Sequence, residues 1–188
     1  MPIDGAIRVT EPLDYFKQDW YCKWLCRVGM REANRIKKEA MAIGSAVDEC
    51  IKTGQVKVLP KYKVEIENCL RAYKSWKEVY RPKEIVPGVR LFGNVGGVKV
   101  TGEPDIFVDG VLVDIKCARK ISLSYWIQVN VYRFLGMETG KVAILRLDKV
   151  TGSYEYVEKD FDLSLVSVWI GLMNAMVYFK GDEADECS

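Results

Sequence analysis

The stretch GEPDIFVDGVLVDIK contains two aspartates whose spacing would let them bind one metal ion together. Asp109-Gly110 within it is typical of the type I′ turn of a two-residue β-hairpin. With that turn at the tip, Asp105 faces Asp114, and the Cβ atoms of facing residues lie about 4.5–5.5 Å apart. Two like charges this close destabilise a hairpin. A divalent cation would remove that cost, because Mg²⁺ is held by one or two carboxylates together with waters and substrate phosphates.

A lysine follows the second aspartate. Lys116 lies two residues after Asp114, so the pleat places both side chains on one face of the strand. Its ammonium group could neutralise charge that develops during phosphodiester hydrolysis, or orient the attacking water. The alternative is an ordinary hairpin whose charges face solvent, with Lys116 paired to the facing Glu103. In both cases the other face must pack on the core, because it carries only apolar residues: Pro104, Ile106, Val108, Val111, Val113 and Ile115.

The chain contains no histidine, which excludes several classes of enzyme. Ser-His-Asp and Cys-His nucleophiles, histidine general bases and histidine-based zinc sites all need the missing imidazole. Carboxylates, lysine, tyrosine or a metal ion must therefore carry any chemistry at neutral pH. The net charge of +2 is too small to indicate nucleic-acid binding by itself, so DNA contacts would have to come from a local basic surface.

Apolar periodicity predicts the elements that position the hairpin. Helical spacing is expected over 13–24, 36–51, 66–80, 122–137 and 163–179, and strands are expected over 84–116, 141–150 and 153–161. The order predicts an α/β (α+β) class with a mixed central sheet flanked by helices. With 188 residues, 49% of them hydrophobic, we expect a single domain over 1–188. It would comprise a helical part over 1–82, the sheet and catalytic core over 83–180, and a frayed tail over 181–188.

The sequence has neither a run of 18 apolar residues nor the pattern of a signal peptide. We therefore expect a cytoplasmic protein without membrane contact, located in the host cytoplasm if the source is viral. Its cysteines are scattered, and in such a chain most are small buried hydrophobes. They are Cys22, Cys26, Cys50, Cys69, Cys117 and Cys187.

The hairpin stretch resembles the signature of the PD-(D/E)XK nuclease superfamily, with Pro104-Asp105 and Asp114-Ile115-Lys116 as its two elements. Twelve residues beyond the lysine, QVNVY resembles the QxxxY motif of the RecB-like branch, which includes CRISPR-associated RecB-like nucleases and phage and viral exonucleases. Residues i and i+4 share one face of a helix. Gln128 and Tyr132 would thus both face the metal centre and the substrate.

A third element of that branch is GxxxH on a helix before the sheet, in which the histidine is a metal ligand. Here the corresponding place is Gly44–Asp48, so Asp48 stands where the histidine would be. An oxygen ligand suits Mg²⁺ or Mn²⁺ at least as well as imidazole does. Glu49 competes for the same role, and a solvated Asp48 without a metal role is the other alternative.

The resemblance covers roughly residues 12–135 and implies a restriction-endonuclease-like core with extra N-terminal helices. It implies a metal bound by Asp105, Asp114 and the Ile115 backbone carbonyl, a catalytic Lys116, and a substrate held by the QxxxY pair. The implied reaction is Mg²⁺- or Mn²⁺-dependent hydrolysis of DNA. Within it we expect an exonuclease acting on single strands or DNA ends, in phage, viral or prokaryotic DNA processing.

Basic and aromatic side chains outside the motifs are further candidates for DNA contact. Arg119 and Lys120 directly follow the catalytic strand, where they would neutralise phosphates. An upstream basic run is either a second DNA contact or a solvated helix face: Arg27, Arg31, Arg35, Lys37 and Lys38. Three nearby aromatic residues either stack on single-stranded bases or belong to the core: Trp20, Tyr21 and Trp24.

Some members of the branch hold an iron–sulfur cluster with one cysteine before the GxxxH helix and three near the C-terminus. Cys22 or Cys26 fits the first place, but only Cys187 lies near the C-terminus. Because such a cluster needs four thiolates, the sequence argues against it. The pair at 22 and 26, one helical turn apart, would then simply pack.

Two rivals to the enzyme remain. The same fold could serve as a non-catalytic module that binds DNA or a partner nuclease, which the missing histidine would permit. The other rival is an unrelated globular protein whose hairpin mimics the motif. A homo-oligomer stays open under all three hypotheses.

Overall fold

The computed structural model describes residues 5–15, 19–55, 59–137 and 140–186. Its α-helices are α1 (Asp19–Val28), α2 (Met30–Thr53), α3 (Lys63–Tyr80), α4 (Leu123–Leu135) and α5 (Leu163–Glu186), with short 3-10 helices η1 (Pro12–Tyr15) and η2 (Pro60–Tyr62). Its strands are β1 (Ile7–Arg8), β2 (Ile85–Pro87), β3 (Leu91–Val95), β4 (Val98–Gly102), β5 (Ile106–Val108), β6 (Val111–Lys116), β7 (Lys141–Leu147) and β8 (Tyr154–Asp160).

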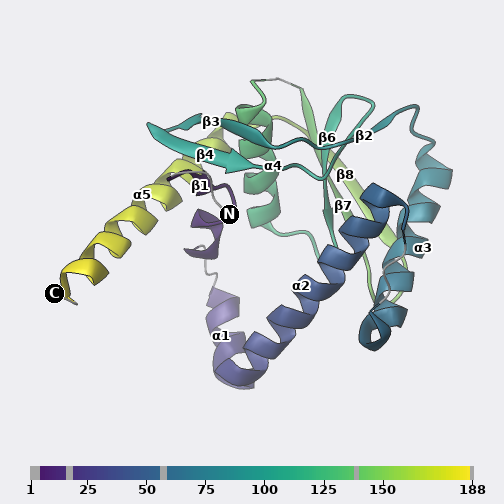
Figure 1. The fold of residues 1–188 in the computed structure, drawn as a ribbon, viewed down its shortest axis with the longest axis horizontal. Coiled ribbons are helices and arrows are strands. Elements are labelled where there is room, and N and C mark those ends of the chain that lie inside the picture. Colours follow the sequence, from purple (N-terminus) through teal and green to yellow (C-terminus); the bar gives the residue numbers. More distant parts are fainter. Residues whose placement is uncertain (1–4, 16–18, 56–58, 138–139, 187–188) are drawn as a thin grey trace.

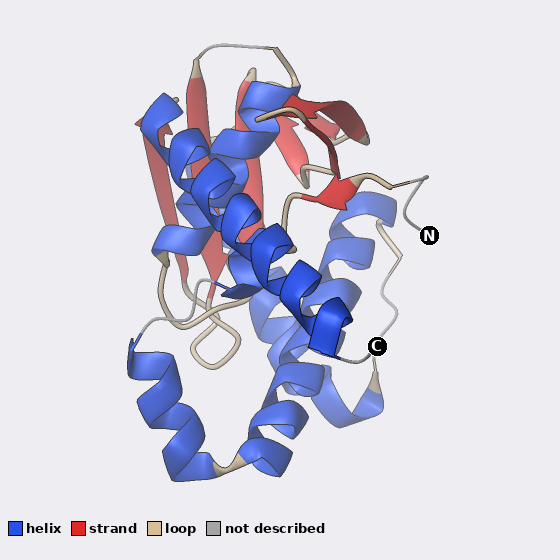
Figure 2. Ribbon diagram, turned by 90° about the vertical axis from the view of Figure 1, so that its left-hand side faces the viewer, coloured by secondary structure: helices blue, strands red, loops and turns tan. Residues whose placement is uncertain are grey.

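The central sheet has the order β2-β5-β6-β7-β8, and helices cover both of its faces (Figures 1 and 2). β6 and β7 run parallel, whereas the other neighbours run antiparallel. One core cluster joins the sheet to α2 and α3, and a second joins it to α4 and α5. The predicted mixed α/β class is therefore confirmed, and its central strands are buried on both sides.

A second, smaller sheet has the order β1-β4-β3 and lies against α4 and α5. Its first strand is only two residues long and pairs in parallel with β4, which is too short for periodicity to reveal. Trp169 of α5 fastens it, because its indole N–H donates a hydrogen bond of 2.8 Å to the carbonyl of Val9. The small sheet is thus packed on α4 and tied to α5 by this hydrogen bond.

The hairpin has the predicted turn and register. Asp109 and Gly110 have φ of 49° and 83°, both in the left-handed region that a type I′ turn requires. Val108 pairs with Val111 and Ile106 with Val113, and the apolar face packs against α2 and α3. The alternative in which the opposite face is exposed to solvent is wrong, because α4 covers Leu112 and its neighbours on that side.

Two predicted boundaries need correction. The first helix does not run through 13–24: a 3-10 turn occupies Pro12–Tyr15, and α1 begins at Asp19. The side chain of Trp20 lies outside the described residues. The tail expected to fray from residue 181 continues α5 to Glu186, because an alanine and two glutamates after Gly181 favour a helix and no proline stops it. None of the helices in the described part of the chain is both long and apolar enough to span a bilayer.

Candidate active site

Asp105 lies directly before β5 and is held by the end of β6. Its Oδ2 accepts a hydrogen bond of 2.7 Å from the backbone N–H of Ile115. The backbone ladder between β5 and β6 ends at Ile106, so Asp105 is not a backbone partner of Asp114 as the extended register predicts. Instead a carboxylate oxygen takes the N–H of the residue after Asp114, which still brings the two acidic residues to the same end of the hairpin.

Asp114 is an interior carboxylate with 1% of its surface exposed. The ammonium group of Lys116 donates a hydrogen bond of 3.1 Å to its Oδ1 and lies 2.8 Å from its Oδ2. The two side chains thus share one face, as the two-residue spacing predicts. The lysine side chain keeps 21% exposure, and its Nζ lies 5.2 Å from the centre of the Tyr125 ring. It therefore reaches from the buried carboxylate towards solvent.

The alternative partner proposed for the lysine is wrong. Glu103 lies 3.2 Å from Arg90 and 3.6 Å from Lys52. The chain leaves β4 after Gly102, and Glu103 pairs there with Arg90 and Lys52 rather than with Lys116. The pairing of Lys116 with Asp114 means that the charges are arranged around the site rather than spread over a solvent face.

Asp48 comes to the same place from α2. A cavity of about 440 Å³ is lined by Asp48, Asp105, Ile115 and Lys116 together with residues of the α2 surface. Asp48 Oδ2 pairs with Lys52 at 3.1 Å, one helical turn further on. Glu49 has an exposed side chain and is not among the residues that line this cavity. Of the two candidates on α2, only Asp48 thus faces the hairpin carboxylates.

Gln128 and Tyr132 share one face of α4, as their spacing predicts, and both are buried. The Gln128 amide donates a hydrogen bond of 2.8 Å to the Tyr132 hydroxyl. The tyrosine ring is packed so tightly against β4 that a Cβ on Gly102 would lie 2.3 Å from its Cε1. Burial, and then the nearby Asp114 carboxylate, raises the pKa of Tyr132 to about 12. The hydroxyl therefore stays protonated at neutral pH.

The carboxylates of the site are electrostatically strained. Burial, reinforced by the Asp114 carboxylate, raises the pKa of Asp105 to about 7. Burial also raises the pKa of Asp114, although Lys116 opposes it. For Lys116, burial lowers the pKa, but the neighbouring Asp114 and Asp105 outweigh it and leave the pKa above its ordinary value. Lys116 thus faces one buried and one half-buried acid, and a further cation would stabilise both.

The donor set fits a hard divalent cation. Within the described residues, no three Asp, Glu or Cys side chains are already gathered as ligands of one ion. One buried acceptor atom, Asp48 Oδ1, nevertheless accepts no hydrogen bond from that part of the chain, and Asp114 Oδ2 has only its ion-pair contact with Lys116. Mg²⁺ needs only one or two carboxylates, because waters and substrate oxygens complete its coordination. The residues that would hold it are Asp105 and Asp114, with the Ile115 carbonyl and Asp48 beside them.

Other predicted residues lie outside this group. Arg119 and Lys120 are exposed in the loop between β6 and α4, and neither lines the cavity beside Asp105. Cys22 and Cys26 are exposed on α1 rather than packed, and α1 lies next to α2 and away from the strands of the central sheet (Figure 1). Cys187 lies outside the described residues.

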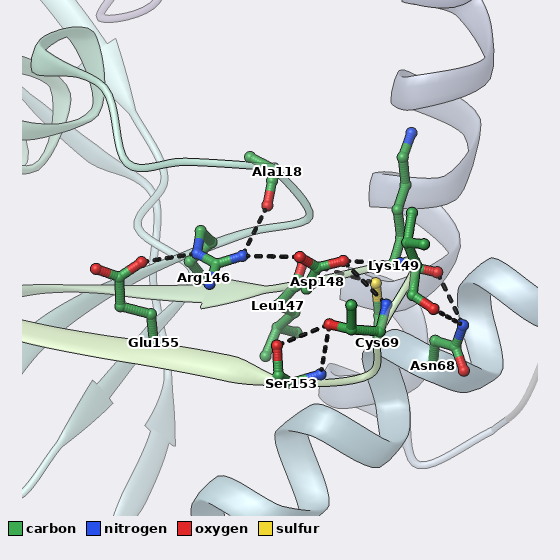
Figure 3. A network of polar contacts seen from close by, with 11 residues as sticks. Asn68, Cys69, Ala118, Arg146, Leu147, Asp148, Lys149, Ser153 and Glu155 are labelled. Atoms are coloured by element: carbon green, nitrogen blue, oxygen red, sulfur yellow. Dashed lines mark hydrogen bonds and ion pairs between the residues drawn. The ribbon is translucent and has the colours of Figure 1, made fainter.

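The structure adds a residue that the sequence analysis missed. Arg146 of β7 pairs in register with Lys116 across the parallel ladder. Its guanidinium donates hydrogen bonds to the carbonyl of Ala118 at 3.4 Å, to Asp148 at 3.2 Å and to Glu155 at 2.8 Å (Figure 3). It thereby holds in place the loop that follows Lys116. The signal was a single charged residue inside the apolar run KVAILRL.

No protein-family model matches the sequence, and no curated protein matches it. The fold, in contrast, is similar to solved structures. A protein of Eubacterium rectale assigned as an exonuclease aligns with a TM-score of 0.60 at 18% identity, over 95% of this chain and 82% of that one. A phage-related exonuclease from Haemophilus somnus 129PT aligns with a TM-score of 0.50 at 14% identity, over 97% and 96% of the two chains. The chain therefore has a mixed α/β fold that exonucleases also use.

Proposed function

We propose that this protein is a metal-dependent DNA nuclease of the PD-(D/E)XK type, in the RecB-like branch. The observation that carries the proposal is the pair Asp114–Lys116, an interior carboxylate in contact with an ammonium group that reaches a cavity lined by two further acids. Buried acids with raised pKa values and a partly exposed cation are typical of functional sites. An ordinary surface hairpin would not bury the aspartate.

The residues divide the work of phosphodiester hydrolysis. A bound Mg²⁺ or Mn²⁺ would supply Lewis-acid activation of the phosphate and of a water. Lys116 is protonated at neutral pH because the acids raise its pKa, so it stabilises negative charge on the phosphate and positions the water rather than accepting a proton. Asp105 is oriented by the Ile115 N–H, which fixes its carboxylate for metal binding.

The QxxxY pair would align the substrate strand. The Tyr132 hydroxyl accepts the hydrogen bond from Gln128, so its own proton remains available to a phosphate oxygen. The same ring lines another cavity of about 440 Å³, which Gly102 and Glu103 also line.

Exonuclease activity on single strands or DNA ends is the mode that we favour. It is supported by the fold shared with the two exonucleases and by the resemblance of QVNVY to a motif of phage and viral exonucleases. A role in phage, viral or prokaryotic DNA processing rests on that resemblance alone.

The test is cleavage of linear and circular DNA, single- and double-stranded, with Mg²⁺, with Mn²⁺ and with EDTA. We expect metal-dependent loss of linear DNA and none of the circles, and Asp114→Asn should abolish it while the circular dichroism spectrum stays unchanged. Cleavage by Asp114→Asn at the wild-type rate would overturn the site. Binding of DNA without cleavage under every metal would instead favour the non-catalytic module, which the aspartate in place of the family histidine permits.

A further inference from the structure

A helical arm extends from the body of the molecule beside the proposed site. It consists of α1 and the first turns of α2, residues 19–39, and is here called the basic arm. In two perpendicular views it extends beyond the strands of both sheets (Figures 1 and 2). Its outer surface is therefore not needed to cover the sheet.

The basic arm carries the positive charge of the protein. It contains six Lys and Arg residues and three Asp and Glu residues, a net charge of +3, whereas the whole chain has +2. The rest of the molecule is thus slightly acidic. A local field of this kind attracts a polyanion to one place on the surface.

The charges within the arm are not equally available. Arg35 is neutralised by Glu32 and Glu39, with a distance of 2.8 Å to the latter. Arg27, Arg31 and Lys38 are exposed and form no ion pair with any residue that the structure describes. These three side chains could therefore bind phosphates without first breaking an ion pair.

Aromatic rings lie among these charges. The rings of Tyr21 and Trp24 on α1 are 5.6 Å apart and tilted by 41°, and Lys37 Nζ lies 5.1 Å from the Tyr21 ring. Neither ring belongs to the two core clusters. Rings interleaved with basic side chains are typical of surfaces that bind single-stranded nucleic acid, because unpaired bases stack on the rings while the cations hold the phosphates.

The arm is continuous with the site. α2 is one helix from Met30 to Thr53, so the same rod carries Arg31 near its start and Asp48 near its end. At a rise of about 1.5 Å per residue the two Cα atoms lie roughly 25 Å apart. That distance corresponds to about seven nucleotides at 3.4 Å per nucleotide of a stacked strand.

From the charge, the rings and this continuity we propose that the basic arm binds a single-stranded segment of the DNA substrate, about seven nucleotides from the bond that is cleaved. The inference rests on the proposed nuclease function for its substrate. It adds a second, separate contact, which a mononucleotide or a very short oligonucleotide cannot reach.

The test is the double variant Arg27→Gln/Arg31→Gln, with Lys63→Gln/Lys74→Gln on α3 as the control of equal charge change. Lys63 and Lys74 are exposed on another helix. Fluorescence anisotropy in EDTA measures binding of a labelled 20-nucleotide thymidine strand, so the result does not depend on cleavage. We expect the arm variant to bind the strand about tenfold more weakly. The dependence of log K on log salt should become less steep by about 1.4, since each of the two lost phosphate contacts contributes about 0.7 to its magnitude. The control should change neither.

A ring variant gives an independent measurement. Trp24→Leu keeps an apolar side chain on α1 and removes the stacking surface, so it should weaken binding of the 20-nucleotide strand about fivefold or more. Its salt slope should stay unchanged, because no charge is lost. An unchanged affinity in both the arginine and the tryptophan variants would overturn the proposal. Equal loss of affinity for a 20-base-pair duplex would overturn the single-strand assignment.

Cleavage with Mn²⁺ separates this inference from the proposed function. We expect the arginine variant to lower kcat/KM for the 20-nucleotide strand about tenfold and to leave that for a four-nucleotide strand unchanged. A variant in which cleavage of both lengths is lowered equally, beside an active wild type, would contradict the role of the basic arm and leave the nuclease proposal intact. If the arm variants weaken DNA binding but the wild-type protein cleaves neither strand, the nuclease proposal is contradicted and the proposed role of the basic arm stands.

Discussion

The backbone N–H of Ile115 donates a hydrogen bond of 2.7 Å to Oδ2 of Asp105, and this bond closes the hairpin at the end where its ladder has stopped. It fixes the carboxylate between the core and the cavity. The bond uses one of the lone pairs of Oδ2, so the carboxylate keeps acceptor sites on both oxygens for a cation. The same bond opposes the rise in the pKa of Asp105, but burial and Asp114 outweigh it.

The pKa of Asp105 leads to a prediction about the metal-free protein. The folded-state pKa of about 7 lies above the ordinary 3.8, so between these values the folded protein binds a proton that the unfolded chain does not. Stability must then fall as pH rises through this window. Between pH 5 and pH 8 the free energy of unfolding should drop by about 2–3 kcal/mol at most, measured by urea denaturation in EDTA.

Two comparisons check this assignment. Asp105→Asn should remove most of the pH dependence, since the amide does not titrate. Mg²⁺ at millimolar concentration should restore stability at pH 8 and not at pH 5, because the cation binds only the ionised form. A metal-free wild type that is more stable at pH 8 than at pH 5 would contradict the raised pKa.

Lys116→Ala should damage both stability and catalysis. Removing the ammonium leaves Asp114 buried without its partner, and breaking a buried pair costs about 3 kcal/mol, less here because the acid can take up a proton. Loss of a preorganised group that stabilises developing charge lowers kcat about 10²–10³-fold. Urea denaturation and single-turnover cleavage measure the two effects.

Two controls test whether the effect is specific to Lys116 and to the shape of its ammonium group. Lys99→Ala removes an exposed lysine of β4 and should change neither quantity. Lys116→Arg should recover stability but little activity, because a planar guanidinium does not present its charge as a compact ammonium does. Full activity of Lys116→Ala with Mn²⁺ would exclude a catalytic lysine.

Local sequence sufficed for the hairpin and for one helix of the site. The Asp109-Gly110 turn and the alternation around it set which side chains share a face, whereas the third acid on α2 was indicated by the resemblance of Gly44–Asp48 to the GxxxH element, with Glu49 as its competitor. Contacts between distant segments were out of reach: that Glu103 pairs with Arg90 and Lys52 depends on where β4 ends. Periodicity reports burial on one element, and it says nothing of which elements meet.

Gly102 should be intolerant of a side chain. A methyl group there would lie 2.3 Å from the Tyr132 ring, and the ring is held by Gln128 and the core. Gly102→Ala is expected to lower the free energy of unfolding by about 1–3 kcal/mol and to reduce cleavage by displacing the tyrosine. Thermal denaturation and cleavage of linear DNA measure these effects.

The matched control is Gly171→Ala in α5, where a Cβ would meet nothing within 4 Å. Alanine is the better helix former, so this variant should be slightly more stable, by about 0.5–1 kcal/mol, and fully active. Two alanine variants with the same stability would show that the tyrosine can move aside without cost.

Arg146 should act as a positioning residue for the end of β6. Its guanidinium ties the Ala118 carbonyl to Asp148 and Glu155 (Figure 3), and it stands level with Lys116 in the parallel ladder. Arg146→Met keeps the aliphatic stem and removes these bonds, so the lysine loses its fixed place. We expect kcat to fall about tenfold with KM nearly unchanged, since a small misplacement of a catalytic group costs rate.

Stability alone cannot produce that pattern. Lys141→Met removes another cation of β7, exposed at the start of the strand and paired at 2.6 Å with Glu158 of β8, and such a pair contributes only about 0–1 kcal/mol. Both variants should be assayed well below their melting temperatures, so that each is fully folded. A normal kcat in Arg146→Met, or an equal loss in Lys141→Met, would mean that the network stabilises β7 without positioning Lys116.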